Sequence, residues 1–361
     1  MEIEKEMQLS VVVPFHRNLD NLSRCLSAVR AAAPNLPDGT LLRGTIVVAD
    51  GAPDDPIHVA AANGARVLAI DGPRGPAAAR NRGAAVSSGD VLVFVDSDVV
   101  IRSQSLSQLA RRLAADPELG AVFGAYDEHP ADPGFFSQGR NLAHSFIHQR
   151  SAGEARTFWA GLGAVRADLF ERVGGFDERF VRPSVEDIDL GYRMRAAGGR
   201  ILLDPQIQGQ HLRRWTLLGS VGTDIRDRGV PWTQLLHRYG GLHDDLNVTR
   251  AYRACVVLAY VLVLCLVLAP WWPMLIAAVP IVVLSLWLLD RPYYQFFASR
   301  RGRGYAVAWF PVHVLHHLCN GLSFAVGTIL YSCRRWIGVS LPGTLPVTTW
   351  PAKEHCVIRT A

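Results

Sequence analysis

One segment constrains the fold of this chain more than any other: residues 91–95 read VLVFV and run directly into Asp96-Ser97-Asp98. A short, wholly apolar run of β-forming residues predicts a strand that is buried on both faces, as in parallel sheets. In open α/β sheets, ligands bind outside the carboxyl ends of the strands, which is where these two acids stand. A divalent ion bridging carboxylates to a phosphorylated ligand would stabilise them there. An N-cap aspartate followed by a solvated loop aspartate is the alternative interpretation.

Strand and helix patterns alternate around this segment. The pattern predicts a Rossmann-like α/β fold with a parallel sheet. A loop followed by a helix is expected over residues 132–149. The expected strands are residues 9–15, 45–48, 66–70 and 91–95, and the expected helices are residues 18–33, 76–87, 106–115, 167–173 and 187–197.

Hydrophobicity is distributed unevenly over the 361 residues. The first 250 or so residues have the composition of a soluble domain, whereas the stretch from Arg253 to Cys333 is strongly apolar. Residues 254–289 predict a tight hairpin of two short spans, and residues 305–332 predict a third membrane segment. Residues 215–239 mix apolar and basic side chains, which favours amphipathic helices at the membrane surface over an ordinary surface helix.

Four regions follow from these patterns. They are an α/β domain at residues 1–214, interfacial helices at 215–250, a membrane region at 251–333 and a tail at 334–361. The first residues are charged and lack the apolar core of a signal peptide, so we expect the α/β domain on the cytoplasmic side of a bacterial-type inner membrane. The number of complete spans stays open, because three spans would place Arg334 and Arg335 outside, against the positive-inside trend.

Charge and cysteine usage exclude two further classes of protein. A net charge of +5, without arginines and lysines interleaved with aromatic residues, does not fit a nucleic-acid reader. None of the six cysteines forms a CxxC pair, so we expect reduced thiols and neither disulfides nor a zinc site.

A polar stripe lies inside the third membrane segment. Its spacing places His313, His316, His317 and Asn320 on one helical face. No acid or cysteine of that segment joins the face, which disfavours a metal cluster. We therefore expect the stripe to face the protein or the lipid headgroups, where it would line the entry route of a lipid molecule from the bilayer.

Two loops carry groups suited to a nucleotide. Asp50 follows the second strand, where an acid accepts from a base or a ribose hydroxyl, or shapes the turn before Gly51. Residues 72–83 read GPRGPAAARNRG; the glycines permit close backbone approach and Arg80 supplies a phosphate-binding fork. A helix with surface arginines is the alternative.

Two later motifs carry groups suited to catalysis and metal binding. Glu186-Asp187 opens a helix, where a carboxylate is stabilised as the anion and is able to serve as a base or as a cap. His211, beside Arg213, Arg214 and Trp215, is a metal-capable imidazole or a structural histidine.

In this order the pieces resemble the family 2 glycosyltransferases with the GT-A fold, specifically the membrane-anchored bacterial type. The resemblance covers roughly residues 9–239 and, more loosely, the apolar region. It rests on the following elements in chain order: Asp50, the loop at 72–83, Asp96-Ser97-Asp98, FWAGLGA at 158–164, GGFD at 174–177, Glu186-Asp187 and His211-x-x-Arg214-Trp215.

The resemblance implies a role for each matching residue. Asp187, with its neighbour Glu186, corresponds to the catalytic pair, and Asp187 would be the base. Asp98, with Asp96 and His211, would hold Mg²⁺ or Mn²⁺. Histidine replaces the usual first residue of the last motif, which does not favour processive polymer synthesis. Donor-binding residues would be Pro14, Asp50, Arg80, Asp96, Gly161, Gly163, Arg214 and Trp215.

The function that this resemblance implies is an inverting, metal-dependent transfer of a sugar from a nucleotide-sugar donor. The acceptor would be a lipid or lipid-linked glycan at the cytoplasmic membrane face, in cell-envelope glycan biosynthesis. A polyprenyl-phosphate sugar synthase is an alternative enzyme. A non-catalytic nucleotide-sugar-binding membrane scaffold is an alternative of another class, and too few spans are predicted for a transporter.

Overall fold

The computed structural model describes residues 6–240, 249–340 and 344–345, and these divide into two compact units. Unit 1 contains the described residues up to Asp132 and residues 151–214, and unit 2 contains residues 133–150 and the described residues from Trp215 to Leu345. The helix predicted after residue 132 therefore belongs to unit 2, whereas the prediction placed it in the first domain. Most of the predicted tail, with Cys356, lies outside the described residues.

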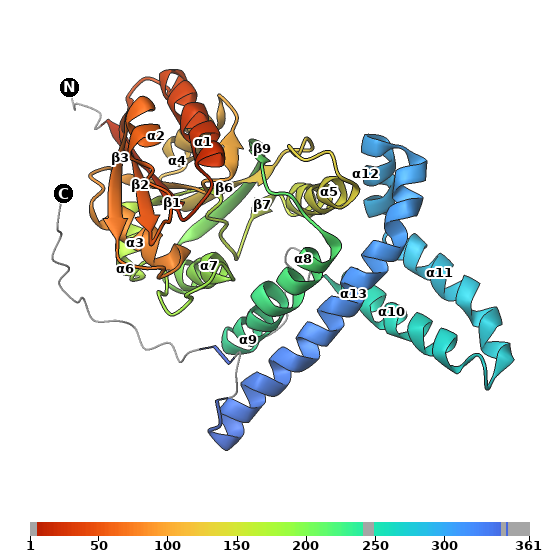
Figure 1. Cartoon of the computed structure of the whole chain (residues 1–361). Coiled ribbons are helices and arrows are strands. Elements are labelled where there is room, and N and C mark those ends of the chain that lie inside the picture. Colours follow the sequence, from red (N-terminus) through yellow and green to blue (C-terminus); the bar gives the residue numbers. More distant parts are fainter. Residues whose placement is uncertain (1–5, 241–248, 341–343, 346–361) are drawn as a thin grey trace. The chain divides into compact units, whose positions relative to one another are not determined.

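Within its described residues, unit 1 is built on one nine-stranded sheet (Figure 1). Neighbouring strands follow the order β3-β2-β1-β4-β8-β6-β9-β5, and β7 pairs with β9. Strands β1 to β4 are parallel, whereas β8 is antiparallel to both β4 and β6. The bounds are β1 Met7–Phe15, β2 Thr40–Asp50, β3 Ala65–Ile70, β4 Val91–Val95, β5 Val99–Ile101, β6 Leu119–Tyr126, β7 Gly153–Glu154, β8 Leu162–Arg166 and β9 Arg200–His211.

The helices of unit 1 cover this sheet through apolar stripes. Every residue of β4 is buried, as the composition of the strand predicts. Helix α1 buries Leu22, Cys25, Leu26 and Val29 at helical spacing against the core that β4 shares. The helices are α1 Leu19–Ala32, η1 Ala33–Asn35, α2 Ile57–Ala62, α3 Pro76–Ala85, α4 Ser105–Ala115, α6 Ala167–Arg172 and α7 Glu186–Ala196.

The predicted α/β fold is confirmed, and each expected strand and helix of unit 1 exists within a few residues of its predicted bounds. The second strand is longer than expected, since it begins at Thr40. The prediction missed β6, β8 and β9, which complete the sheet beyond β4. Strand β8 contains Gly163 and Ala164, and β9 contains Pro205 and several glutamines, so neither shows a strong strand signal.

Unit 2 is helical throughout its described elements. Helices α10 and α13 are the longest, and α13 contains Pro311. The bounds are α5 Phe135–Arg150, α8 Leu217–Gly222, η2 Thr223–Gly229, α9 Val230–Arg238, α10 Arg250–Leu268, η3 Pro273–Ala277, α11 Ala278–Leu289, α12 Arg291–Arg301, α13 Arg303–Ser332 and η4 Cys333–Ile337.

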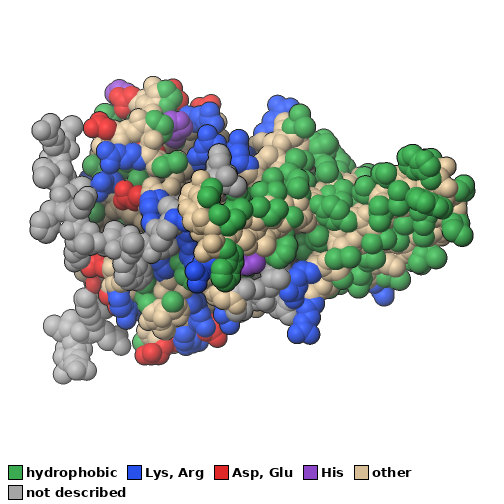
Figure 2. Space-filling view, turned by 90° about the horizontal axis from the view of Figure 1, so that it is seen from below, with side chains coloured by type: hydrophobic (Ala, Val, Ile, Leu, Met, Phe, Trp, Pro, Cys, Tyr) green, Lys and Arg blue, Asp and Glu red, His purple; other side chains and the backbone are tan. Residues whose placement is uncertain are grey.

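Two helices of the described residues, α10 and the continuous helix at residues 303–337, are long and apolar enough to cross a membrane. The helices at 273–289 and 291–301 would count as a third span only together, and they bend by 74° at their junction. Hydrophobic side chains cover most of the visible surface of the α10–α11 hairpin (Figure 2). In the segment from α10 to η3, Leu264, Trp271 and Met274 are each more than half exposed, at 55%, 68% and 78%.

The histidine stripe of α13 is buried inside unit 2. His313, His316 and His317 are 4%, 5% and 1% exposed. Other helices of unit 2 add an acid and a thiol beside this face, which the spacing within α13 does not reveal. Asp290, which lies between α11 and α12, places its Oδ2 3.0 Å from Nε2 of His317, and Cys255 of α10 joins the same group.

Candidate active site

The acidic segment after β4 forms a tight turn at the carboxyl edge of the sheet. The Asp96 backbone N–H donates to the Gly161 carbonyl at 3.1 Å, and its carbonyl accepts from the Val99 N–H at 2.9 Å. The Asp98 carbonyl accepts from the Leu212 N–H at 2.9 Å. The turn is thus fixed from both sides, and the Asp96 and Asp98 side chains stay 29% and 33% exposed.

Arg80 of α3 links this turn to the start of α7. Its guanidinium is buried, with Nη2 2.7 Å from Asp96 Oδ1 and Nη1 2.9 Å from Glu186 Oε1. Burial alone would lower the pKa of Arg80, but the carboxylates of Asp96 and Glu186 raise it above its ordinary value. A permanently charged guanidinium therefore holds two acids from distant parts of the sequence in one place.

The Glu186-Asp187 pair divides into one buried and one accessible carboxylate. Glu186 uses Oε1 for Arg80 and accepts the Ser184 N–H at Oε2, at 2.8 Å. Asp187 accepts the Ile188 N–H at Oδ1 and the Ala160 N–H at Oδ2, at 2.8 and 3.3 Å. Backbone donors at a helix N-terminus favour the ionised carboxylate, which a general base must be. Asp187 is thus the better placed of the two for a reacting group.

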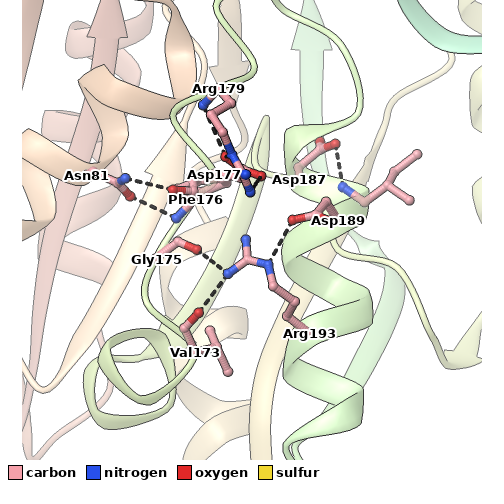
Figure 3. Close-up of polar contacts among 10 residues, drawn as sticks. Asn81, Val173, Gly175, Phe176, Asp177, Arg179, Asp187, Asp189 and Arg193 are labelled. Carbon is pink, nitrogen blue, oxygen red and sulfur yellow. Dashed lines mark hydrogen bonds and ion pairs between the residues drawn. The ribbon is translucent and has the colours of Figure 1, made fainter. Parts of the chain in front are cut away.

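A second arginine that the sequence argument missed anchors α7 below Asp187 (Figure 3). Arg193 donates to the carbonyls of Val173 and Gly175 at 2.7 and 2.6 Å, and pairs with Asp189 at 2.7 Å. Asn81 bonds the backbone N–H and carbonyl of Phe176 in the same turn, each at 2.8 Å. The Gly174-Gly175-Phe176 sequence indicates a turn at this point, but it does not indicate that Arg193 contacts the turn.

Asp98 and His211 meet at the end of β9. Nε2 of His211 lies 3.5 Å from Asp98 Oδ2, and its ring stacks on Tyr126 with 4.2 Å between ring centroids. Burial raises the pKa of Asp98, but the hydrogen bond and charge of His211 and the charge of Arg213 outweigh it and hold the pKa below its usual range. Tyr126 is a further support of this site that sequence reasoning did not identify.

The donor set fits a hard or borderline divalent cation. An ionised carboxylate and an imidazole are ligands for Mg²⁺ or Mn²⁺, and such ions complete their shell with phosphate oxygens and water. Asp98 and His211 supply two protein ligands and do not surround the ion. Among the described residues, the three-membered group of potential metal ligands lies elsewhere, in unit 2.

Asp50 holds the loop before α3 through both oxygens of its carboxylate. It is 5% exposed, and its two oxygens accept the backbone N–H groups of Arg74 and Gly75, each at 2.7 Å. A Cβ at Gly72 would collide with this carboxylate, so the loop approaches closely because glycine stands there. The carboxylate of Asp50 therefore positions the loop before α3.

The remaining predicted residues lie on the sheet or at its exit. Pro14 is in β1 opposite Val48, and Gly163 is in β8 opposite Phe94. Gly161 supplies the carbonyl that holds Asp96. A Cβ at Gly163 would meet the Trp159 carbonyl at 2.5 Å, which explains the small residue.

Arg214 and Trp215 are separated by the boundary between the units. Arg214 is 82% exposed and its Nε lies 3.8 Å from Asp132 Oδ2. Trp215 belongs to unit 2, where its backbone N–H donates to Ser137 Oγ at 2.7 Å and the Arg140 guanidinium lies over its ring. The structure thus gathers the other predicted residues in unit 1 but gives Trp215 a packing role in unit 2.

Comparisons with known proteins find similar chains. Residues 10–174 match the family model described as Glycosyl transferase family 2. The pre-mycofactocin glycosyltransferase of Mycobacterium tuberculosis is 30% identical over 251 residues, which cover 66% of this chain and 47% of the relative. The validoxylamine A glucosyltransferase of Streptomyces hygroscopicus subsp. jinggangensis is 30% identical over 227 residues, which cover 53% of this chain and 52% of the relative. The chain spans about half the length of the curated relatives it matches.

A solved structure supports the fold. A mannosyltransferase from Pyrobaculum calidifontis, in complex with GDP-Man and Mn²⁺, superposes with a TM-score of 0.52 at 16% identity. The match covers 91% of this chain and 87% of the mannosyltransferase. At 16% identity this similarity shows a shared fold alone.

Proposed function

We propose, from the match of residues 10–174 to the family model described as Glycosyl transferase family 2, that the chain moves a sugar from a nucleoside-diphosphate sugar to an acceptor hydroxyl. One observation carries the proposal: Arg80 ties the Asp96 turn to the first residues of α7, where Asp187 lies. The acids that would bind the donor and accept a proton are thereby held in one unit.

We assign the two functional carboxylates different tasks. Asp187 takes the proton from the acceptor hydroxyl as the oxygen attacks the anomeric carbon and the bond to the diphosphate breaks. One displacement of this kind inverts the anomeric configuration. Asp98 and His211 would hold Mg²⁺ or Mn²⁺, and the bound ion would neutralise charge on the departing nucleoside diphosphate. Arg80 acts as a positioning residue, because both of its outer nitrogens already hold carboxylates.

The proposed location follows from unit 2. Helices α10 and α13 have the length and apolarity of membrane spans, and the α10–α11 hairpin exposes large hydrophobic side chains. We propose that these helices anchor the enzyme in the inner membrane of a bacterial-type cell, with the catalytic domain cytoplasmic. A lipid or lipid-linked glycan in cell-envelope biosynthesis is then the acceptor class that such an anchored enzyme meets.

A donor screen tests the proposal. The full chain in detergent is incubated with a panel of nucleotide sugars, with and without Mn²⁺, and the released nucleoside diphosphate is measured. We expect release with one donor class, strengthened by Mn²⁺, and no release above background in Asp187→Asn. The matched control is Asp168→Asn, which removes an acid that is 73% exposed on α6. Absence of release with every donor would favour the non-catalytic scaffold.

The polyprenyl-phosphate sugar synthase remains the second enzymatic candidate because a lipid phosphate needs little help from a base. The same assay distinguishes the two. Turnover of a polyprenyl phosphate that survives in Asp187→Asn would support the synthase, whereas turnover that requires Asp187 supports attack by a hydroxyl.

A further inference from the structure

Three helices of unit 2 bring a thiol, a carboxylate and an imidazole together in its interior. Cys255 comes from α10, His317 from α13, and Asp290 from the junction of α11 and α12. All three are buried, and their potential ligand atoms lie within 4.8 Å of one another. Among the described residues this is the group of three that meets that distance.

The spacing of this Cys255–Asp290–His317 cluster is close to that of a metal site. Asp290 Oδ2 lies 3.0 Å from His317 Nε2, and His313 Nδ1 lies 3.9 Å from the same oxygen. Bonds of about 2.0–2.3 Å in a tetrahedral zinc site place neighbouring ligand atoms roughly 3.3–3.7 Å apart. Side-chain adjustments of an ångström or less would bring the three atoms to that spacing.

The charge of Asp290 also favours a bound cation in this cluster. The Asp290 side chain is 10% exposed, and its ion-pair partners in the described residues are the imidazoles of His313 and His317. A buried carboxylate without a strong cation is costly. Zn²⁺ with one thiolate, one carboxylate and one neutral imidazole gives a site with no net charge, which removes that cost.

The imidazole of His317 is incompletely bonded. Its Nδ1 is buried and has no hydrogen-bond partner among the described residues. Its ring packs against Tyr252, whose hydroxyl accepts from Asn320 at 2.7 Å. The ring is thus held in orientation by packing and by Nε2, the nitrogen that faces Asp290 and would bind a cation in the cluster, whereas Nδ1 is not part of the cluster.

We propose that Cys255, Asp290 and His317 bind one Zn²⁺ ion that fastens α10 and α13 to the junction of α11 and α12. A thiolate and an imidazole select zinc over the oxygen-preferring Mg²⁺ and Mn²⁺, so this ion differs from the one proposed at Asp98. His313 is not counted among the ligands, because its Nδ1 already pairs with the Tyr294 hydroxyl at 2.9 Å. The role is structural, and the site stands independently of the proposed sugar transfer.

Cobalt is the probe that separates this site from every other. The full chain in detergent is stripped with a chelator and titrated with Co²⁺, and the absorption from thiolate-to-cobalt charge transfer is recorded. We expect a band that saturates at one Co²⁺ per chain and disappears when one equivalent of Zn²⁺ is added. Cys255→Ser loses the band, and His317→Gln weakens Co²⁺ binding by at least tenfold.

Two matched controls remove one thiol each without touching the cluster. Cys265→Ser changes another buried cysteine of α10, and Cys25→Ser changes a thiol whose Sγ lies 3.5 Å from the Asp96 carbonyl. Both are expected to retain the band. A wild-type chain without a thiolate band, or a band that survives in Cys255→Ser, overturns the proposal. If Cys255→Ser does not fold, the wild-type band and the weakened Co²⁺ binding of His317→Gln decide.

Discussion

Each unit buries an arginine against carboxylates, and the two clusters differ in what surrounds them. In unit 1, Arg80 bonds Asp96 and Glu186, and the Asp96 side chain stays 29% exposed. In unit 2, Arg140 pairs with both oxygens of Asp224, and the two side chains are 8% and 9% exposed. The first cluster opens to solvent at the carboxyl edge of the sheet, where a ligand is able to reach it, whereas the second is closed.

This difference separates a positioning role from a purely structural one. A buried pair that is broken on one side leaves an uncompensated charge in the interior, while an acid near solvent is able to rehydrate. We therefore expect a change in the closed Arg140–Asp224 cluster to alter stability alone. The open cluster should affect both stability and sugar transfer.

The largest expected loss of stability follows from Arg140→Met. It leaves Asp224 buried without its guanidinium, and His316 at 3.7 Å is the remaining ion-pair partner in the described residues. We expect the free energy of unfolding to fall by about 3–5 kcal/mol. Thermal unfolding in detergent measures it, and the double variant Arg140→Met with Asp224→Asn should recover part of the loss. An unchanged melting temperature in the single variant would contradict the assignment of a buried pair.

Arg80→Met should lower the free energy of unfolding less than Arg140→Met does, but it should impair sugar transfer. Glu186 loses its partner, but Asp96 is partly exposed, so we expect a loss of about 2–3 kcal/mol. Transfer should fall to background because the turn and α7 are no longer tied together. The control is Arg172→Met, which removes an arginine that is 58% exposed. Full activity in a folded Arg80→Met protein would remove the positioning role.

The smallest effect concerns pH. Burial and then the charge of Arg228 lower the pKa of His148 in α5 to about 4. Between pH 6.5 and 4, His148 binds a proton in the unfolded chain but not in the folded chain. The free energy of unfolding therefore falls as the pH falls through this window. For this partly buried ring we expect a contribution of about 1 kcal/mol at pH 5. His148→Gln should flatten the dependence of the melting temperature on pH below 6.5; an unchanged slope would exclude His148 as its source.

The sequence predicted those parts of the molecule that contiguous patterns encode. Residues 91–95 were predicted as a buried strand because all five are apolar β-forming residues, so neither face of the strand is suited to solvent. Asp96-Ser97-Asp98 follows directly in sequence and therefore lies at the carboxyl end of this strand. The site residues Arg80 and Glu186 were both identified, but not their contact, since 106 residues separate them in the chain. Their distance depends on the order of strands and the placement of α7, which local patterns do not contain.

The same reason explains what was missed or misjudged. Asp50 was identified, but not its contacts with the backbone N–H groups of Arg74 and Gly75, which lie 24 and 25 residues later in the chain. Trp215 belongs to the same motif as Arg214, yet it lies in unit 2. The ligands beside His317 come from α10 and from the junction of α11 and α12, so inspection of α13 alone did not reveal them.

The central claim is that Asp98 and Asp187 act at different stages: Asp98 in donor binding and Asp187 in the transfer step. One paired measurement tests it directly: nucleotide-sugar affinity in Mn²⁺ and turnover number, determined for Asp98→Asn and Asp187→Asn in the full chain. We predict that Asp187→Asn keeps the affinity within about twofold and loses at least about 100-fold in turnover, the scale of a general base. Asp98→Asn should weaken the Mn²⁺-dependent affinity at least tenfold. Equal losses of affinity in both variants, or full turnover in Asp187→Asn, would contradict this division of roles.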